Sequence, residues 1–223
     1  MKSMIKHFLG FVLALAAAAG MALAAVMLVK GYGMYQDALL RESLTDKVAA
    51  VQAGENYVTA DRLPATYLEA VVATEDHRFY RHGGIDVIGL ARALWSNLRA
   101  GALEEGGSTI TQQLAKNLYF MDEKSLVRKV AEAFMAFKLE KTYTKAQILE
   151  LYVNCIYFGS GCYGVRAASL CYFGKEPGEM SADECTLLAG IPNAPSVYSP
   201  KENPDLAHDR QQYVERQMEK YAA

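Results

Sequence analysis

The sequence has little net charge, little strand-like patterning and no closely spaced pair of cysteines. Its 23 basic and 25 acidic residues give a formal net charge of −2, which offers no electrostatic argument for binding nucleic acid. The four cysteines show no Cys-x-x-Cys spacing, and this argues against a zinc site. Alternation of apolar and polar residues is scarce, whereas apolar residues often recur at helical spacing, so the sequence predicts a mainly α-helical protein.

Charge is absent from one long segment at the N-terminus. No charged residue occurs from Phe8 to Val29, and lysines flank this run on both sides. About 20 apolar residues can cross a bilayer as a helix, whereas a secretory signal has an apolar region of about 7–15. We therefore predict a transmembrane anchor over residues 8–29, with residues 1–7 in the cytoplasm and the remainder outside the membrane. A signal peptide cleaved near Ala24 is the alternative; the N-terminal position disfavours a buried helix of a soluble protein.

All four cysteines fall in the part of the chain that we expect to be exported, where disulfides are permitted but not required. Cys171 and Cys185 lie in apolar helical patterns that are typical of core positions. Cys155 and Cys162 flank a glycine turn and are the pair that we would test for a disulfide.

Residues 30–61 are predicted to form a stalk with a weak helical stripe, and residues 62–223 one helical domain. Helix starts are marked by prolines and by Ser or Thr capping signals, several of them followed three residues later by Gln or Glu. These starts are Pro64, Thr109, Ser125, Thr144, Ser181 and Pro204. Gly159 to Gly164 matches the dinucleotide pattern GxGxxG, but the preceding segment is predicted to be helical, so we interpret it as a turn between helices.

Glu75 is the first candidate for chemistry, because it ends the apolar run of the helix that starts at Pro64. Val71, Val72 and Phe79 can desolvate its carboxylate, which raises the pKa and makes a better base. We expect His82 or a neighbouring arginine to orient it. An exposed glutamate at a helix end is the alternative interpretation of this position alone.

The segment from Gly106 to Asn117 is the second candidate. Its glycine turn precedes a helix start, where free backbone N–H groups and the helix dipole favour an anion, and Lys116 follows on the same helix. Further along, Arg128 and Glu132 are i,i+4 neighbours. They form either a simple intrahelical ion pair or an acidic group held by an arginine at the same cleft.

Together these motifs resemble the peptidoglycan glycosyltransferase family, which includes monofunctional transglycosylases and the glycosyltransferase domain of class A penicillin-binding proteins. The resemblance covers about Leu63 to Met218. The matching segments are Glu75 to Gly84, Gly107 to Asn117, Arg128 to Glu132, Ile148 to Asn154, Gly164 to Lys175 and Leu188 to Pro195.

The resemblance implies polymerisation of lipid II, a disaccharide-pentapeptide on a polyprenyl pyrophosphate, into β-1,4-linked glycan strands. Glu75 matches the base that takes the proton of the acceptor 4-hydroxyl, and Glu132 matches a second catalytic glutamate. The attack inverts the anomeric carbon of the growing chain and expels the lipid pyrophosphate. Substrate-binding positions are implied at Asp76, Phe79, His82, Gly107, Ser108, Thr109, Gln113, Lys116, Asn117, Arg128 and Lys129.

The implied fold is a lysozyme-like, two-lobed helical domain whose smaller apolar lobe dips into the bilayer. Leu90, Leu94, Trp95 and Leu98 are the candidates for that contact, although packing in the core would use the same stripe. The implied location is the bacterial plasma membrane, crossed once. The chain is either a monofunctional enzyme or the front part of a longer one.

No cofactor or metal ligand set is expected, although Mg²⁺ or another divalent cation at the pyrophosphate is left open. Expected partners are lipid II, the growing strand and the membrane; transpeptidases and other cell-wall synthesis proteins are left open. Two rival functions remain: a lysozyme-like glycoside hydrolase or lytic enzyme, and a non-catalytic membrane-tethered glycan-binding module. The cationic residues favour a transferase, because a pyrophosphate leaving group needs positive charge whereas a sugar alkoxide needs a carboxylic acid.

Overall fold

The computed structural model describes residues 2–101, 106–121, 123 and 125–221 of the chain. Within these ranges the regular structure is almost entirely helical, and an isolated antiparallel bridge joins Tyr157 to Tyr163. The prediction of a mainly α protein is confirmed. The α-helices are α1 (Lys2–Arg41), α2 (Leu44–Gln52), α3 (Ala65–Glu75), α4 (Val87–Ala100), α5 (Ile110–Tyr119), α6 (Leu126–Thr142), α7 (Lys145–Cys155), α8 (Val165–Phe173), α9 (Ala182–Gly190) and α10 (Pro204–Tyr221).

The helix starts follow the capping signals of the sequence. Thr109, Thr144 and Ser181 each form a complete capping box with the residue three positions later. Ser125 accepts a hydrogen bond from the Arg128 N–H at the start of α6, and Pro64 precedes α3. Each cap satisfies backbone N–H groups that have no partner within the helix, so these ends are fixed by local sequence.

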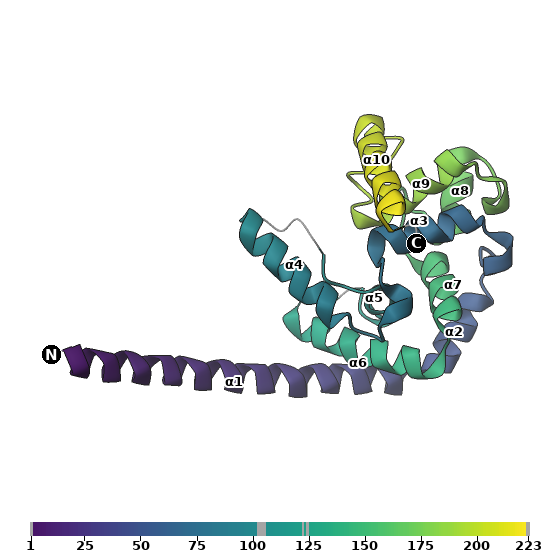
Figure 1. The fold of residues 1–223 in the computed structure, drawn as a ribbon. Coiled ribbons are helices and arrows are strands. Elements are labelled where there is room, and N and C mark those ends of the chain that lie inside the picture. The colour runs from purple at the N-terminus through teal and green to yellow at the C-terminus, as the bar shows by residue number, and fades with distance from the viewer. Residues whose placement is uncertain (1, 102–105, 122, 124, 222–223) are drawn as a thin grey trace.

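Helix α1 divides into a free part and a packed part. Its stretch from Gly10 to Arg41 is apolar and long enough to cross a membrane, and its most apolar window is not buried in the protein. Figure 1 shows the N-terminal half of α1 projecting away from the other helices, while its C-terminal part lies along α6. A buried helix of a soluble protein is therefore the wrong interpretation of this segment.

The contact between α1 and α6 is close because Gly31 faces Val130. A Cβ atom added at Gly31 would lie 2.5 Å from the Val130 Cβ, so a larger residue would force the helices apart. Next to it, the Tyr32 and Phe134 rings meet edge to face with centroids 5.2 Å apart. The anchor helix thus continues directly into the packing of the domain.

The segment for which we expected a stalk, residues 30–61, also lies against the domain. Leu44 and Val48 on α2 are buried in the main core, and α2 contacts α7. The predicted domain boundary at residue 62 stays a prediction, but the preceding residues contribute to the same core.

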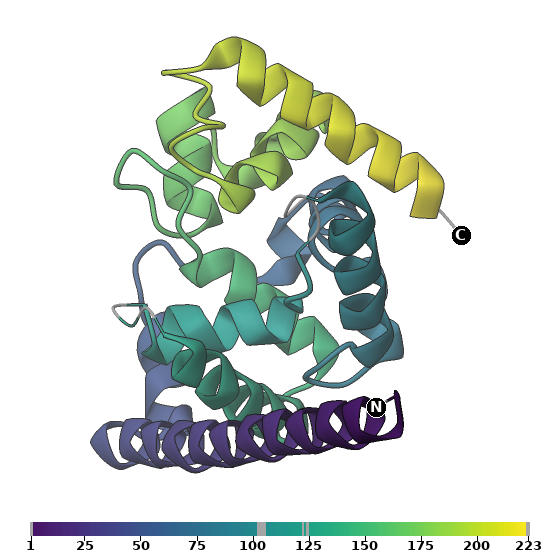
Figure 2. The same ribbon diagram turned by 90° about the vertical axis from the view of Figure 1, so that its left-hand side faces the viewer.

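The remaining helices form two groups with α3 between them. Helices α5, α6 and α7 pack on one another, and α9 and α10 pack on α3. Figure 2 shows α8, α9 and α10 at one end of the molecule and α1, α5 and α6 at the other. Helix α3 ends at Glu75, so the first candidate residue lies where the two groups meet.

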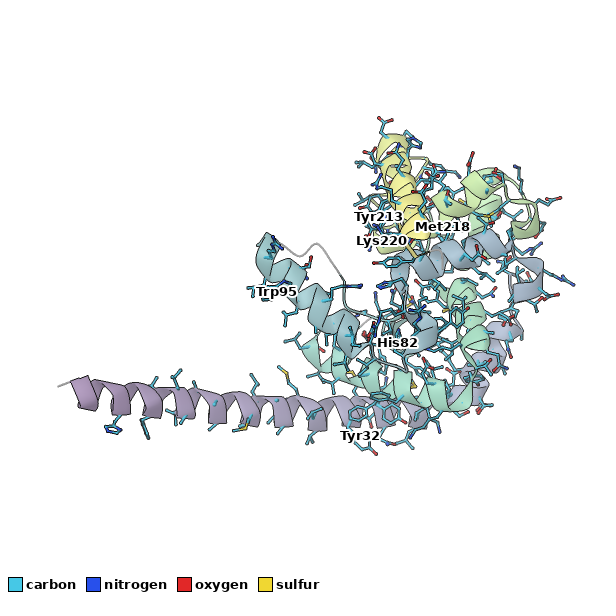
Figure 3. All side chains as sticks on the ribbon, in the orientation of Figure 1. Tyr32, His82, Trp95, Tyr213, Met218 and Lys220 are labelled. Carbon is cyan, nitrogen blue, oxygen red and sulfur yellow. The ribbon has the colours of Figure 1, made fainter. Side chains whose placement is uncertain are left out.

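Helix α4 leaves its apolar side chains uncovered. Trp95 is 68% exposed and Leu98 75%, and Leu90 and Leu94 are exposed as well, whereas Ala93 is buried. Figure 3 shows Trp95 away from the body of the domain, and in Figure 1 α4 and the free half of α1 project to the same side of the molecule. Packing of this stripe in the protein core, the alternative left open by the sequence, is therefore excluded.

Candidate active site

A cavity of about 500 Å³ opens between the end of α3, the start of α5, α6 and α10. Of the residues predicted from sequence, five line it: Glu75, Ser108, Gln113, Lys116 and Lys129. The other lining residues are Ala73, Thr74, His77, Arg92, Gly106, Pro192, Asn193, Arg210, Tyr213, Gln217, Lys220 and Tyr221. A carboxylate and at least five basic side chains thus face one polar cavity.

Glu75 has one engaged and one unengaged carboxylate oxygen. Its Oε2 accepts a hydrogen bond of 2.8 Å from Gln113 Nε2, while Oε1 is buried and has no hydrogen-bond partner among the described residues. Burial raises the pKa of Glu75; the Gln113 hydrogen bond and the Arg210 charge oppose this shift, and Asp76 adds to it. A carboxylate with a raised pKa and an unpartnered oxygen at a cavity is suited to accept a proton.

The orientation of Glu75 is set by a chain of hydrogen bonds through Gln113. The hydroxyl of Tyr152, which is fully buried on α7, donates to Gln113 Oε1 over 3.1 Å, so that the Gln113 amide nitrogen points at Glu75. We expected His82 or a neighbouring arginine to orient Glu75, and this is wrong for His82 and Arg78, which bind other residues. His82 binds Asp76, and Arg78 binds Asp86.

Asp76 occupies the N-terminus of α5. Its Oδ2 accepts the Ile110 N–H over 3.1 Å, and its Oδ1 lies 2.8 Å from His82 Nε2. The Thr109 and Gln112 N–H groups are used within the capping box. The expectation of free N–H groups that bind a substrate anion at this helix start is therefore wrong for these three groups, because Asp76, from a distant part of the chain, already supplies the negative charge.

Several other predicted site residues have mainly structural contacts. Phe79 is fully buried in the core, and Lys145 Nζ lies 4.1 Å from its ring centroid. The Thr109 hydroxyl donates to the Gly84 carbonyl, and Asn117 donates to the Gln113 carbonyl. Gly107 faces Leu90 and Ala93 of α4. Their substrate-binding roles stay predictions.

Three cations gather around Glu132, which is fully buried on α6. Arg128 Nε and Lys129 Nζ lie 3.2 and 2.8 Å from its two carboxylate oxygens, and Lys129 also donates to Ser108 Oγ. Burial lowers the pKa of Lys116, the Arg128 charge lowers it further, and Glu132 raises it. We call Arg128 and Lys129 of α6, together with the neighbouring Lys116 of α5, the α6 cation cluster. Glu132 holds Arg128 and Lys129 in place.

Helix α10 supplies a part of the cavity that sequence reasoning missed. Arg210, Tyr213, Gln217, Lys220 and Tyr221 line it, and Figure 3 shows Tyr213 and Lys220 along this helix. The Tyr221 ring stacks on His77 with centroids 3.9 Å apart. The basic residues recur at the spacing of one helix face, but nothing local in the sequence indicates that this face lies opposite Glu75.

One group of side chains has the geometry of a metal site. Candidate ligand atoms of Asp76, His82 and Asp86 lie within 4.8 Å of one another. However, Asp76 is engaged by His82 and Ile110, and Asp86 binds Arg78 through two hydrogen bonds of 2.8 and 2.9 Å. Although burial opposes it, these bonds hold the pKa of Asp86 below its ordinary value. The group fits a hydrogen-bonded support for the end of α3.

The comparisons with known proteins agree with the motifs. The transglycosylase family matches residues 42–219. The chain is 50% identical over 162 residues to penicillin-binding protein 1A of Aquifex aeolicus (strain VF5), a match that covers 73% of this chain and 22% of the relative. It is 48% identical over 155 residues to penicillin-binding protein 1A of Neisseria cinerea (70% and 19%) and 45% identical over 157 residues to penicillin-binding protein 1F of Bacillus subtilis (strain 168) (70% and 22%).

These matches span about a fifth of the length of the curated relatives. The family match, over residues 42–219, includes Glu75, the α6 cation cluster and most residues that line the cavity. The chain therefore belongs to the transglycosylase family, the peptidoglycan glycosyltransferases that its sequence motifs predicted.

Proposed function

We propose that this chain polymerises lipid II into β-1,4-linked glycan strands by transferring the growing chain from its polyprenyl pyrophosphate to the 4-hydroxyl of an acceptor. The observation that carries the proposal is that Glu75, whose pKa burial raises, lines the same cavity as Lys116 and Lys129 of the α6 cation cluster. A base and a site for an anionic leaving group are the two requirements of this reaction.

The donor pyrophosphate binds beside the α6 cation cluster. Lys116 and Lys129 line the cavity, and Ser108 lies next to Lys129. As the glycosidic carbon–oxygen bond breaks, negative charge develops on the pyrophosphate, and these preorganised cations stabilise it. Glu132 is fully buried, so its part is to hold Arg128 and Lys129 rather than to contact the sugar.

The acceptor binds on the side formed by α3 and α10. The Glu75 carboxylate accepts the proton of the 4-hydroxyl while the hydroxyl oxygen attacks the anomeric carbon from the face opposite the leaving group, which inverts the configuration. Arg210 and Lys220 line this side of the cavity and offer charge to the acceptor's own pyrophosphate. Arg210 also stabilises the carboxylate form of Glu75, which is the form that accepts a proton.

The membrane arrangement follows from α1 and α4. Helix α1 anchors the chain, and the exposed apolar residues of α4 enter the same bilayer from its outer surface. This position brings the cavity to the depth at which a polyprenyl-linked substrate presents its headgroup. We propose the bacterial plasma membrane, with the N-terminus in the cytoplasm.

A hydrolase is less well supported by the same cavity. Glycosidases use two carboxyl groups that flank the bond, one of them a protonated acid. Here the second glutamate is fully buried with a cation within 3.2 Å of each oxygen, so its carboxyl group is engaged by cations and does not flank a bond in the cavity. The structure therefore offers charge for a pyrophosphate in the place where a hydrolase needs an acid.

The deciding experiment uses purified full-length chain with lipid II, with and without EDTA, and analyses products by chain length. We expect glycan strands from the wild type and a loss of about 10³-fold in the rate for Glu75→Gln. EDTA tests whether a divalent cation assists. Release of reducing ends from finished peptidoglycan without use of lipid II would instead support the hydrolase. Binding of lipid II with no turnover would support a glycan-binding module.

A further inference from the structure

The turn between α7 and α8 doubles back on itself. The Phe158 N–H donates to the Cys162 carbonyl and the Gly164 N–H to the Ile156 carbonyl, which brings the two arms together beside the bridge between Tyr157 and Tyr163. Gly164 has a φ of +80°, and a Cβ there would lie 2.5 Å from the Asn154 carbonyl oxygen. These contacts therefore fix the backbone conformation of the turn and require glycine at position 164.

The last turn of α8 lies against this doubled-back segment. The Tyr172 hydroxyl donates to the Phe158 carbonyl over 2.7 Å. Its neighbour Cys171 receives a contact of 3.4 Å from Lys201 Nζ, and the same ammonium group lies 5.8 Å from the centre of the Tyr172 ring. Cys171 is partly exposed, so its sulfur is reachable from solvent beside a positive charge.

Cys162 in the turn and Cys171 on α8 belong to the two segments that the hydrogen bond between Tyr172 and Phe158 holds together. Burial raises the pKa of the Cys162 thiol to about 11, and a hydrogen bond with the Cys171 thiol contributes to this rise. Three of the thiols also donate to a backbone carbonyl: Cys162 to that of Ser160, Cys155 to that of Tyr152, and Cys185, which is fully buried, to that of Met180. The surroundings of Cys162 therefore favour Cys171 as its partner over Cys155, the partner suggested by the sequence.

We infer that Cys162 and Cys171 form a reversible disulfide, which ties the turn after α7 to the end of α8. All four thiols are free in the structure, so this is the reduced form of the site. The inference rests on the part of the proposed function that places the domain outside the plasma membrane, where thiol oxidants act; it does not require transferase activity.

The oxidation proceeds by thiol–disulfide exchange with a small or protein disulfide, R–S–S–R. The Cys171 sulfur, which is more exposed and next to the Lys201 ammonium, attacks one sulfur as a thiolate and releases the first thiol, RSH, after protonation. Cys162 then loses its proton to solvent and attacks the Cys171 sulfur, which releases the second RSH. Two protein thiols are oxidised and one disulfide is reduced, so atoms and electrons balance.

The test is mass spectrometry of the full chain in detergent after incubation with oxidised glutathione, followed by alkylation of free thiols in denaturant. We expect two alkylated cysteines instead of four. Because Arg166 lies between the partners, trypsin cuts the chain there, and the disulfide keeps the two peptides together until a reductant is added. Four alkylated cysteines in the treated wild type would overturn the inference.

Single substitutions identify the partners. Cys162→Ser and Cys171→Ser are each expected to abolish the linked peptides, whereas Cys155→Ser is the matched control and leaves them unchanged. This control is needed because Cys155 and Cys162 fall in the same tryptic peptide. Loss of the link in Cys155→Ser would assign the bond to a different pair and overturn the inference.

Thermal unfolding gives a second readout. Closing a short loop restricts the unfolded chain, so oxidation should raise Tm by roughly 5–10 °C in the wild type and in Cys155→Ser, with no such rise in Cys162→Ser. Neither measurement involves lipid II. A chain that forms the link but makes no glycan would therefore contradict the proposed function and not this inference.

Discussion

Glu75 lines the cavity, whereas Glu132 is buried behind Lys129, and the two carboxylates have different electrostatic environments. Glu75 receives a hydrogen bond from a neutral amide and keeps one oxygen without a partner. Glu132 is fully buried but has a cation within 3.2 Å of each oxygen. The first environment raises the pKa of Glu75 by burial and favours proton uptake, whereas in the second the carboxyl group is engaged by two cations. The same side chain can therefore act as a base in one place and as a support for cations in the other.

The two environments also differ in where their partners come from. Arg128 and Lys129 precede Glu132 by four and three residues on α6, so one helical turn is enough to assemble them. The partners of Glu75 come from α5 and α10, and Tyr152 of α7 holds the first of them. Only the complete fold produces the Glu75 site.

Glu132→Ala tests the supporting role of Glu132 and is expected to lower activity more than any other substitution away from Glu75 itself. Without the carboxylate, Arg128 and Lys129 lose their fixed positions and repel each other and Lys116. We expect kcat/KM for lipid II to fall about 100-fold, mainly through KM, because an interaction with the donor pyrophosphate is weakened in the ground state as well. Steady-state kinetics of strand formation measure both constants.

The control is Glu132→Gln, which keeps the volume of the side chain and removes only its charge. Both variants should also lower the stability, by about 1–3 kcal/mol, since Arg128 and Lys129 lose a charged partner. An unchanged KM with a kcat as low as that of Glu75→Gln would show that Glu132 takes part in proton transfer, and the contrast drawn here would fail.

A smaller effect, on pH dependence, is expected from Gln113→Ala. The hydrogen bond from Gln113 lowers the pKa of Glu75, so its removal raises that pKa further. Because the proposed base Glu75 must be ionised to accept a proton, the acidic limb of kcat/KM should move to higher pH, with a loss of roughly 10-fold at the original optimum. Tyr152→Phe, which removes only the bond to Gln113 Oε1, should shift the limb in the same direction by less. A limb that stays in place in both variants would contradict the role of this chain.

The smallest expected effect is a change in the free energy of unfolding of Glu75→Gln. Folding raises the pKa of Glu75, so the protonated form contributes stability that is complete below the unfolded pKa and is lost as pH rises through the folded pKa. At pH 8 the ionised, partly desolvated carboxylate is therefore a cost, and Glu75→Gln should be more stable by about 1 kcal/mol, or roughly 2–4 °C in Tm. The gain should disappear near pH 4. An equal gain at both pH values would show that ionisation of Glu75 is not its cause.

The sequence predicted those features whose causes are local. The capping boxes at Thr109, Thr144 and Ser181 each lie within four residues and were confirmed as helix starts. Three of the N–H groups at the start of α5 are not free, because Asp76, from 34 residues earlier in the chain, binds the Ile110 N–H and the capping box uses those of Thr109 and Gln112. No local pattern reveals that an anion site is already occupied by the protein itself.

Two other features depend on which helices become neighbours. The apolar stripe of α4 is compatible with a core face or an exposed face, and only the structure shows that Trp95 and Leu98 are uncovered. The basic residues of α10 look like an ordinary solvated face in the sequence, yet Arg210 and Lys220 line the cavity. Periodicity identifies a face of a helix, but the arrangement of the fold decides what that face meets.

The unbroken passage of α1 from its apolar stretch into the groove along α6, tightened at Gly31, has a mechanical consequence. With α1 in a bilayer, this packing would limit rotation of the domain relative to its anchor and hold the cavity at one height above the lipid headgroups. For the lipid-linked substrate proposed above, enzyme and substrate would then meet by diffusion in two dimensions.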